Sequence, residues 1–226
     1  MQGNLSAQSV VVTSANRYMG PAISTLFEQE GAAVTRDNGR HYTDDELRTL
    51  LDPAPDVLVV NLAEPPLTAA VDQIKDADWN SLFEALVHPL MRLVRYVAEP
   101  MKTRGSGKII AITSAAPLRG IPHASGYCAA RGAQNAFIRA TGLELAKYNI
   151  QVNAIAQNYI RNDTYYPDDM LDSERFQAHL KAMVPGKRVA ESAETAHLAL
   201  YLASPHCTHM MGQILPLAGG WATTTG

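Results

Sequence analysis

The sequence predicts an α/β fold in which one doubly wound parallel sheet carries helices on both of its faces. Short β-branched runs alternate with longer amphipathic stretches along the chain of 226 residues, which is typical of βαβ units. The chain is 46% apolar, so a protein of this length can bury one large core. We therefore expect a single domain over residues 1–226.

In the first half of the chain, each expected element follows from local periodicity. Strands are expected where short β-branched runs occur, and helices where apolar residues recur at helical spacing. The expected elements are a strand at 10–13, a helix at 21–31, a strand at 33–34, a helix at 44–51, a strand at 57–61 and one long helix at 79–103. The long helix rests on Leu82, Leu86 and Leu90, which fall on one helical face.

In the second half, the run at 108–113 is nearly all apolar, which predicts a central parallel strand buried on both faces. The elements expected after it are a helix at 126–148, a strand at 150–156, a helix at 194–203 and a strand at 213–217. Residues 157–172 are polar, aromatic and contain a proline, so we expect a loop. Long loops in compact domains are usually functional lids or disordered segments, and the aromatic content favours a packed lid.

The charge distribution favours a small-molecule ligand. The 19 Lys and Arg residues and the 22 Asp and Glu residues are spread without a basic block, which argues against nucleic acid and an anionic membrane surface as partners. No uncharged apolar run approaches the roughly 18 residues that span a bilayer, and no leader is recognisable, so we expect a soluble, cytoplasmic protein. Cys128 and Cys207 lack metal-ligand spacing, and no metal site is expected.

Three residues in the middle of the chain have the spacing of a catalytic group. Ser114 follows the apolar strand at 108–113, at the carboxyl end where open α/β sheets bind ligands. Tyr127 and Arg131 lie four positions apart on the next expected helix, so their side chains share one face. Each residue alone is more often a capping group, a half-buried aromatic or a surface charge, and only the joint spacing favours catalysis.

Arg131 supplies the charge that a catalytic tyrosine needs. A phenol has an unperturbed pKa of about 10, so at neutral pH it is almost entirely protonated and cannot act as a base. A nearby cation stabilises the phenolate, which is the form that accepts a proton. A guanidinium about 4 Å away contributes on the order of 4 kcal/mol at an effective dielectric constant of about 20, and it does not lose its proton when buried. Ser114 adds a hydroxyl that can hydrogen-bond a substrate oxygen as negative charge develops there.

With these three residues the sequence resembles the short-chain dehydrogenase/reductase family, which implies a Rossmann-like fold. Ser114 and Tyr127 match the family's catalytic serine and tyrosine, and Arg131 stands where the family has a lysine that also holds the nicotinamide ribose. A Tyr-x-x-x-Arg version is known from the halohydrin dehalogenases, a cofactor-free offshoot. The resemblance covers essentially the whole chain.

The turn that would hold a cofactor is more similar to the halohydrin dehalogenases than to the dehydrogenases. The dehydrogenases have glycines here so that backbone N–H groups can approach the pyrophosphate, but this chain has Ser14 and Tyr18 and keeps Gly20. The segment matches the dehalogenase pattern Thr-x-x-x-x-Phe/Tyr-x-Gly through Thr13, Tyr18 and Gly20. The resemblance therefore implies no cofactor. Asp37 has the position of a residue that binds an adenosine ribose, and we interpret it as a solvated loop charge.

Two further positions depart from the dehydrogenase pattern. Leu86 stands where the dehydrogenases keep an asparagine in their proton relay, and a water-linked relay does not run through leucine. Gln157 and Asn158 replace the Pro-Gly that borders the nicotinamide in those enzymes. Both departures favour the cofactor-free branch.

The resemblance implies a reaction and a set of site residues. Tyr127 would remove the proton from a hydroxyl next to a halogen-bearing carbon, and the alkoxide would expel halide and form an epoxide. In reverse, halide, azide, cyanide or nitrite would open epoxides. The implied halide-binding residues are Tyr18, Gln157, Asn158, Tyr159 and Ile160, and the implied substrate-pocket residues are Pro117, Leu118, Ile121 and Tyr166. For Tyr159 and Tyr166, ordinary packing of loop aromatics is an equal alternative. The family's assembly implies a homotetramer.

Two other functions remain open from the sequence. The first is an NAD(P)-dependent oxidoreductase with an eroded turn, which would bind nicotinamide nucleotides tightly. The second is a non-catalytic, dehydrogenase-like ligand-binding protein, in which a Tyr127→Phe variant would behave like the parent.

Overall fold

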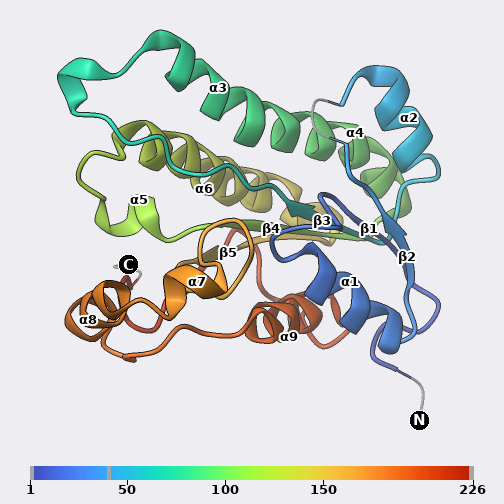
Figure 1. The fold of residues 1–226 in the computed structure, drawn as a ribbon. Coiled ribbons are helices and arrows are strands. Elements are labelled where there is room, and N and C mark those ends of the chain that lie inside the picture. Colours follow the sequence, from blue (N-terminus) through green and yellow to red (C-terminus); the bar gives the residue numbers. More distant parts are fainter. Residues whose placement is uncertain (1–2, 40–41, 224–226) are drawn as a thin grey trace.

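A single parallel sheet organises the structure, a computed structural model that describes residues 3–39 and 42–223. Within these residues, six strands lie in the order β2-β1-β3-β4-β5-β6, with helices on both faces (Figure 1). The strands are β1 (Ser9–Val12), β2 (Ala33–Arg36), β3 (Val57–Asn61), β4 (Gly107–Ser114), β5 (Ile150–Gln157) and β6 (Ile214–Leu217). The expected doubly wound, Rossmann-like α/β fold is confirmed.

The pairing of β4 and β5 places two site residues next to each other. These strands pair over their full length, from Gly107 opposite Ile150 to Ser114 opposite Gln157. Every residue of β5 is buried, as expected for an interior strand that is covered on both faces. Ser114 and Gln157 therefore leave the sheet at neighbouring carboxyl ends, where α/β folds bind their ligands.

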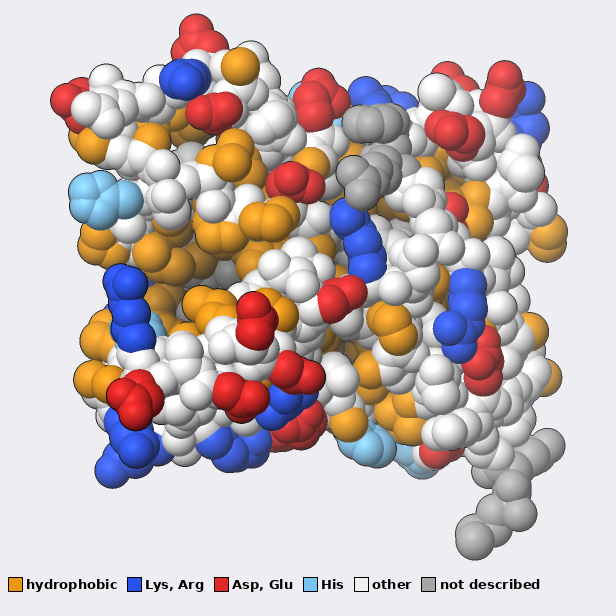
Figure 2. Space-filling model, in the orientation of Figure 1, with side chains coloured by type: hydrophobic (Ala, Val, Ile, Leu, Met, Phe, Trp, Pro, Cys, Tyr) orange, Lys and Arg blue, Asp and Glu red, His pale blue; other side chains and the backbone are white. Residues whose placement is uncertain are grey.

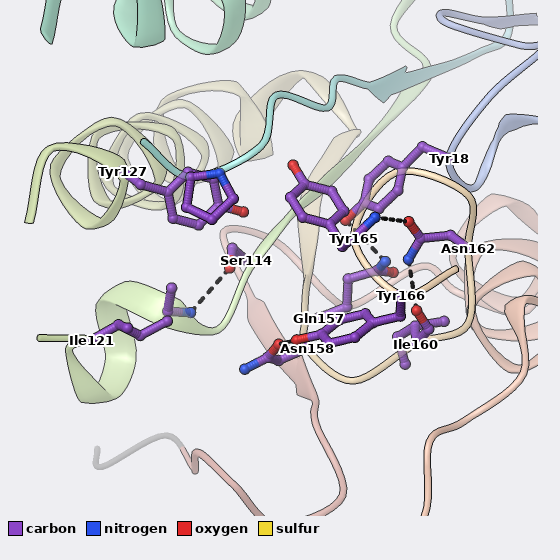
Figure 3. A pocket seen from close by; sticks show the side chains of 12 residues that line it. Tyr18, Ser114, Ile121, Tyr127, Gln157, Asn158, Ile160, Asn162, Tyr165 and Tyr166 are labelled. Atoms are coloured by element: carbon purple, nitrogen blue, oxygen red, sulfur yellow. Dashed lines mark hydrogen bonds between the residues drawn. The ribbon is translucent and has the colours of Figure 1, made fainter. Parts of the chain in front are cut away.

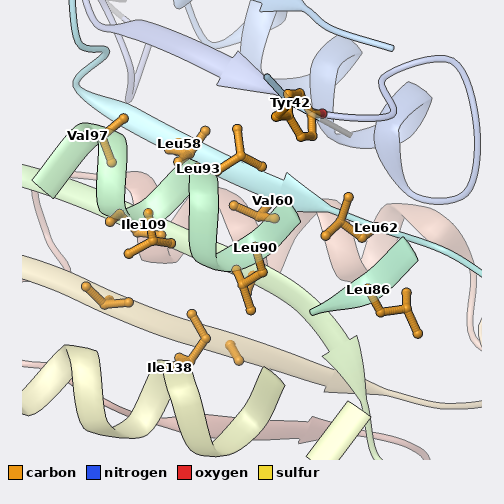
Figure 4. Packing of buried hydrophobic residues seen from close by; sticks show 14 of the residues in the cluster. Tyr42, Leu58, Val60, Leu62, Leu86, Leu90, Leu93, Val97, Ile109 and Ile138 are labelled. Atoms are coloured by element: carbon orange, nitrogen blue, oxygen red, sulfur yellow. The ribbon is translucent and has the colours of Figure 1, made fainter. Parts of the chain in front are cut away.

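The helices form one layer on each face of the sheet. The helices on one face are α1 (Gly20–Gln29) and α9 (Ser192–Ala203). The helices on the other face are α2 (Asp44–Leu51), α3 (Asp76–Leu86), α4 (His88–Arg104) and α6 (Ser125–Leu145). Figure 4 shows leucine side chains of α3 and α4 packed against β3 and β4. No helix in the described part of the chain combines the length and the apolarity needed to cross a membrane.

A third group of elements covers the carboxyl edge of the sheet. These elements are α5 (Ala116–Arg119), α7 (Asp168–Leu171) and α8 (Glu174–Met183), which lie together on one side of the molecule (Figure 1). Short 3-10 helices occur at Val71–Gln73 and Ala146–Tyr148. Tyr159, Phe176 and Trp221 form a separate hydrophobic cluster here. This cluster holds the loop that follows β5 against the sheet.

The prediction of a single long helix at 79–103 is wrong. The helical segment begins at Asp76 and is divided at Val87 into α3 and α4. Pro89 lies in the first turn of α4, where its missing N–H leaves the carbonyl of Ala85 without that donor, while Pro100 lies inside α4 without dividing it. Next to the break, the Leu86 carbonyl accepts a hydrogen bond of 2.7 Å from Gln134 Nε2. The break is thereby connected to α6.

Further features differ from the sequence expectations: α5 has no expected counterpart, and α7 lies inside the expected loop at 157–172. Helix α8 has no counterpart among the expected elements, although Ser173 caps it by accepting a hydrogen bond from the Phe176 N–H at 3.3 Å. Asp37 is not a solvated loop charge. It is half-buried, and its carboxylate accepts hydrogen bonds from the Tyr42 hydroxyl at 2.6 Å and from the Gly39 N–H at 3.0 Å.

Gly142 in α6 allows the helix to approach the sheet closely. A Cβ atom at this position would lie 2.3 Å from the Gly212 backbone nitrogen and 2.8 Å from the Val152 carbonyl oxygen. We expect Gly142→Ala to lower the free energy of unfolding by about 1–3 kcal/mol, because helix and backbone must separate. Urea denaturation measures this change.

Gly132 provides a control on the same helix. A Cβ atom there meets the Pro117 Cβ at 3.4 Å, and alanine is the better helix former, so Gly132→Ala should keep or raise the stability. Equal stability of the two variants would contradict the close approach at Gly142.

Candidate active site

The candidate site is a cavity of about 80 Å³ at the carboxyl edge of the sheet (Figure 3). The residues that line it are Tyr18, Pro66, Ser114, Ala116, Ile121, Tyr127, Gln157, Asn158, Ile160, Asn162, Tyr165 and Tyr166. At the surface, Figure 2 shows hydrophobic side chains around a hollow between the helical layer that contains α6 and the segment that contains α7 and α8. Pockets that bind drug-sized ligands have volumes of about 300–1,000 Å³. This cavity is much smaller, so it suits a small organic molecule.

Ser114 lies at the end of β4 with its hydroxyl at the cavity. Its Oγ accepts a hydrogen bond of 3.1 Å from the Ala116 backbone N–H, and its carbonyl accepts one of 3.2 Å from Asn135 Nδ2. These bonds fix the end of the strand. In this hydrogen bond the Ser114 hydroxyl is the acceptor, so the bond does not use the hydroxyl proton. That proton can be donated to a ligand oxygen.

Tyr127 and Arg131 lie one helical turn apart on α6, and their side chains are in contact. The Arg131 Nε–H donates to the Tyr127 hydroxyl oxygen at 3.1 Å. The Nη1 group donates to Gln134 Oε1 at 2.9 Å, and the Nη2 group donates to the Tyr165 hydroxyl at 2.8 Å. The guanidinium is therefore held from three sides, with one side facing the phenol.

The buried guanidinium of Arg131 forms its hydrogen bonds with hydroxyl and amide groups. The side chain is 0% exposed, and within residues 3–39 and 42–223 no carboxylate forms an ion pair with it. Burial lowers the pKa of the guanidinium, but interactions with Tyr127, Tyr165 and Tyr18 outweigh burial and raise it, so the group stays charged. A buried cation without a counterion is costly. The Tyr127 hydroxyl oxygen is the acceptor that connects this buried charge to the cavity.

Tyr18 forms the opposite wall of the cavity. Its backbone has a φ of +58°, and its ring meets the Tyr165 ring edge-on with 5.2 Å between centroids. Its hydroxyl accepts a hydrogen bond of 2.9 Å from Gln157 Nε2, while Gln157 Oε1 accepts one of 2.9 Å from the Thr195 hydroxyl. Burial raises the pKa of Tyr18, although Arg131 opposes this effect, so this phenol stays neutral.

The loop after β5 closes the cavity with two adjacent tyrosines. Tyr166 donates a hydrogen bond of 2.5 Å to Asn158 Oδ1 and stacks on Tyr159 with 5.5 Å between ring centroids. Tyr165 is absent from the predicted site residues, yet its hydroxyl contacts Arg131 directly. The sequence signal for it is its place beside Tyr166 in the aromatic loop.

The structure brings most of the predicted residues to the cavity and leaves four outside its lining. The predicted residues at the cavity are Tyr18, Ser114, Ile121, Tyr127, Gln157, Asn158, Ile160 and Tyr166, with Arg131 buried behind Tyr127. Tyr159 packs instead against Trp221, and its hydroxyl lies 3.0 Å from His179 Nε2. Pro117 faces Gly132 on α6, and Leu118 packs in the hydrophobic clusters. Tyr159, Pro117 and Leu118 therefore lie outside the lining of this cavity, and their contacts with ligand stay predictions.

The backbone N–H groups of the loop differ in their availability for an anion. The Asn158 N–H donates to the Leu217 carbonyl at 3.1 Å, and the Tyr159 N–H donates to Asn158 Oδ1 at 2.9 Å. In the described part of the chain, the Ile160 N–H has no such partner. Of these three N–H groups, that of Ile160 is therefore available to an anion without the loss of a hydrogen bond to the protein.

The turn after β1 does not fit a nicotinamide dinucleotide. Tyr18, 7% exposed, fills the turn, and its backbone N–H donates to Asp163 Oδ1 at 3.2 Å. A carboxylate thus lies at a donor that a pyrophosphate would need. The Nη2 group of Arg131, at the position of the ribose-binding lysine, is bonded to Tyr165. A dinucleotide would have to displace three side chains.

Comparisons with known proteins relate the chain to two kinds of enzyme. A family model described as Enoyl-(Acyl carrier protein) reductase matches residues 45–222. Nodulation protein G of Rhizobium sp. (strain N33) is 27% identical, with 96% of this chain and 98% of that protein covered. The 3-oxoacyl-[acyl-carrier-protein] reductase FabG of Escherichia coli (strain K12) is 28% identical, with the same shares covered.

Two solved structures carry other names. One, named "Dehalogenation enzyme", has a TM-score of 0.90 and 29% identity, with 98% of this chain and 100% of that chain covered. The other is a halohydrin dehalogenase bound to ethyl (2S)-oxiran-2-ylacetate, with a TM-score of 0.85 and 28% identity over 96% of this chain and 98% of that chain. At similar identity, these two structures carry dehalogenase names and the E. coli relative carries a reductase name.

Titration with nicotinamide nucleotides tests the misfit of the turn. We expect calorimetry with NADH and with NADPH to give no saturable binding, because Asp163 accepts from the Tyr18 N–H in the turn and Tyr165 accepts from Arg131 Nη2. The gluconate 5-dehydrogenase of Burkholderia cenocepacia, whose solved structure holds NADP, is the positive control when it is titrated in the same way. Tight binding of either nucleotide to this chain would contradict the fit argument.

Proposed function

Because the chain belongs to the short-chain dehydrogenase/reductase family, through the model described as Enoyl-(Acyl carrier protein) reductase, we propose that it is a cofactor-independent member that interconverts vicinal halohydrins and epoxides. The observation that carries this proposal is the hydrogen bond from Arg131 Nε to the Tyr127 hydroxyl, in a cavity whose opposite wall is Tyr18. A dehydrogenase needs that opposite space for its nucleotide.

In the proposed reaction, the Tyr127 phenolate removes the proton from the substrate hydroxyl. The resulting alkoxide oxygen forms a bond to the neighbouring carbon as the carbon–halogen bond breaks, and the halide leaves with the electron pair. The Ser114 hydroxyl donates to the substrate oxygen, because its own acceptor side is bonded to Ala116. The substrate carries its own nucleophile at high effective molarity, so no covalent intermediate with the protein is needed.

The leaving halide is assigned to the side of the cavity opposite Ser114. The Ile160 N–H is the available backbone donor there, and Tyr18 can present the positive edge of its ring. Neither group carries a full positive charge that would retain the product. In the reverse direction, protonated Tyr127 donates to the epoxide oxygen while a small anion attacks carbon.

Two observations from relatives bear on the substrate. The solved halohydrin dehalogenase holds an epoxide, which is the product class of the proposed reaction. Against this, the curated relatives with the name 3-oxoacyl-[acyl-carrier-protein] reductase favour a second candidate, an NAD(P)-dependent reductase. The misfit of the turn is the reason for preferring the first candidate.

Halide release without added cofactor tests the proposal directly. We expect purified protein to release chloride or bromide from a simple vicinal halohydrin, and Tyr127→Phe to lower the rate by at least about 100-fold, the range of general base catalysis. Tyr201→Phe removes an exposed hydroxyl on α9 and should behave like the parent. Activity that depends on NAD(P)H, or full activity in Tyr127→Phe, would overturn the proposal.

A further inference from the structure

Tyr165 joins three segments that are distant in the sequence. Its hydroxyl accepts a hydrogen bond of 2.8 Å from Arg131 Nη2 on α6. It also accepts one of 3.0 Å from the Glu64 N–H and donates one of 2.8 Å to the Glu64 carbonyl, in the segment after β3. A single phenol from the loop after β5 therefore contacts both other walls of the site.

The two bonds to Glu64 determine how Tyr165 can bind Arg131. Because its proton is donated to the Glu64 carbonyl, the hydroxyl can only accept from the guanidinium. Burial raises the pKa of Tyr165 well above that of an ordinary phenol, although Arg131 lowers it, so the group remains neutral and does not compete as a base. The titratable side chains that interact with the guanidinium are Tyr18, Tyr127 and Tyr165.

The orientation of Arg131 depends on contacts at both ends of its planar group. Gln134 accepts from Nη1 and Tyr165 accepts from Nη2, which leaves Nε directed at Tyr127. A guanidinium is a rigid fork, so fixing two of its nitrogens fixes the third. Without the Tyr165 hydroxyl, Nη2 would lose this acceptor and the group could turn away from the phenol.

We propose that Tyr165 is a positioning residue that holds Arg131 against Tyr127, so that the loop after β5 contributes to stabilising the phenolate. This inference rests on the proposed function for its catalytic consequence. The same loop carries Asn158 and Ile160, the residues on the anion side of the cavity. An ordered loop therefore holds Arg131 beside Tyr127 and also places the residues on the anion side of the cavity.

The pH dependence of ring closure in Tyr165→Phe tests the proposal. Tyr127 acts as the base, so the rate rises with pH as its phenolate forms, and a poorly held Arg131 moves this rise to higher pH. We expect a shift of about one pH unit and a rate about tenfold lower near neutral pH, the factor associated with one hydrogen bond to a charged group. At high pH, after subtraction of non-enzymatic closure, the rate should return to that of the parent, with KM little changed.

Tyr201→Phe is the matched control, because it also removes one tyrosine hydroxyl but lies on α9. Its profile should coincide with that of the parent. An unchanged profile in Tyr165→Phe, or a loss that is equal at every pH, would overturn the positioning role. Thermal melting of each variant checks the fold.

A spectroscopic titration separates this inference from the proposed reaction. The ultraviolet absorbance of the Tyr127 phenolate is obtained as the difference between a protein and its Tyr127→Phe version. We expect the phenolate to appear at higher pH when Tyr165 is phenylalanine, whether or not halide is released. If the parent releases no halide, the reaction fails, but a shifted titration still supports the positioning role and an unshifted one overturns it.

Discussion

The site depends on one buried charge. The Arg131 guanidinium is fully enclosed, and its hydrogen bonds go to a phenol on either side, an amide and a backbone carbonyl. The Tyr127 oxygen accepts one of these hydrogen bonds and lines the cavity. Burying a cation in this way costs stability, and the proposed role of Tyr127 as a base gives a reason for that cost.

The fold places this charge by a chain of backbone and side-chain contacts. The helical segment is divided at Val87, and the Leu86 carbonyl beside the break accepts from Gln134, which in turn accepts from Arg131. On the other side, the β4–β5 register sets Ser114 beside Gln157, whose amide holds the Tyr18 hydroxyl. The contacts that position Arg131 and Tyr127 thus share one cavity with Tyr18, the residue that stands at the turn after β1. In the proposed function, the arrangement of the base and the misfit of a nucleotide therefore have a common origin.

Local spacing made much of this predictable from the sequence. Tyr127 and Arg131 are one helical turn apart and Ser114 ends a buried strand, so their proximity follows from secondary structure alone. Tyr165 could not be found in this way, because its partner Glu64 is 101 positions away and neither residue has a distinctive pattern. The direction of the Tyr159 ring likewise depends on tertiary packing with Trp221. The break at Val87 does not follow from the presence of a proline alone, because Pro100 lies inside α4 without dividing it.

Relatives with reductase names and a solved dehalogenase are about equally similar in sequence, so identity does not choose between them. The direct measurement is a crystal structure of this protein grown with both bromide and NADPH, in which anomalous scattering locates the bromide. The account predicts bromide at the Ile160 N–H beside Tyr18, with the Arg131–Tyr127 hydrogen bond intact. A dinucleotide seated against the turn at residues 13–20, with Tyr18 displaced, would contradict it.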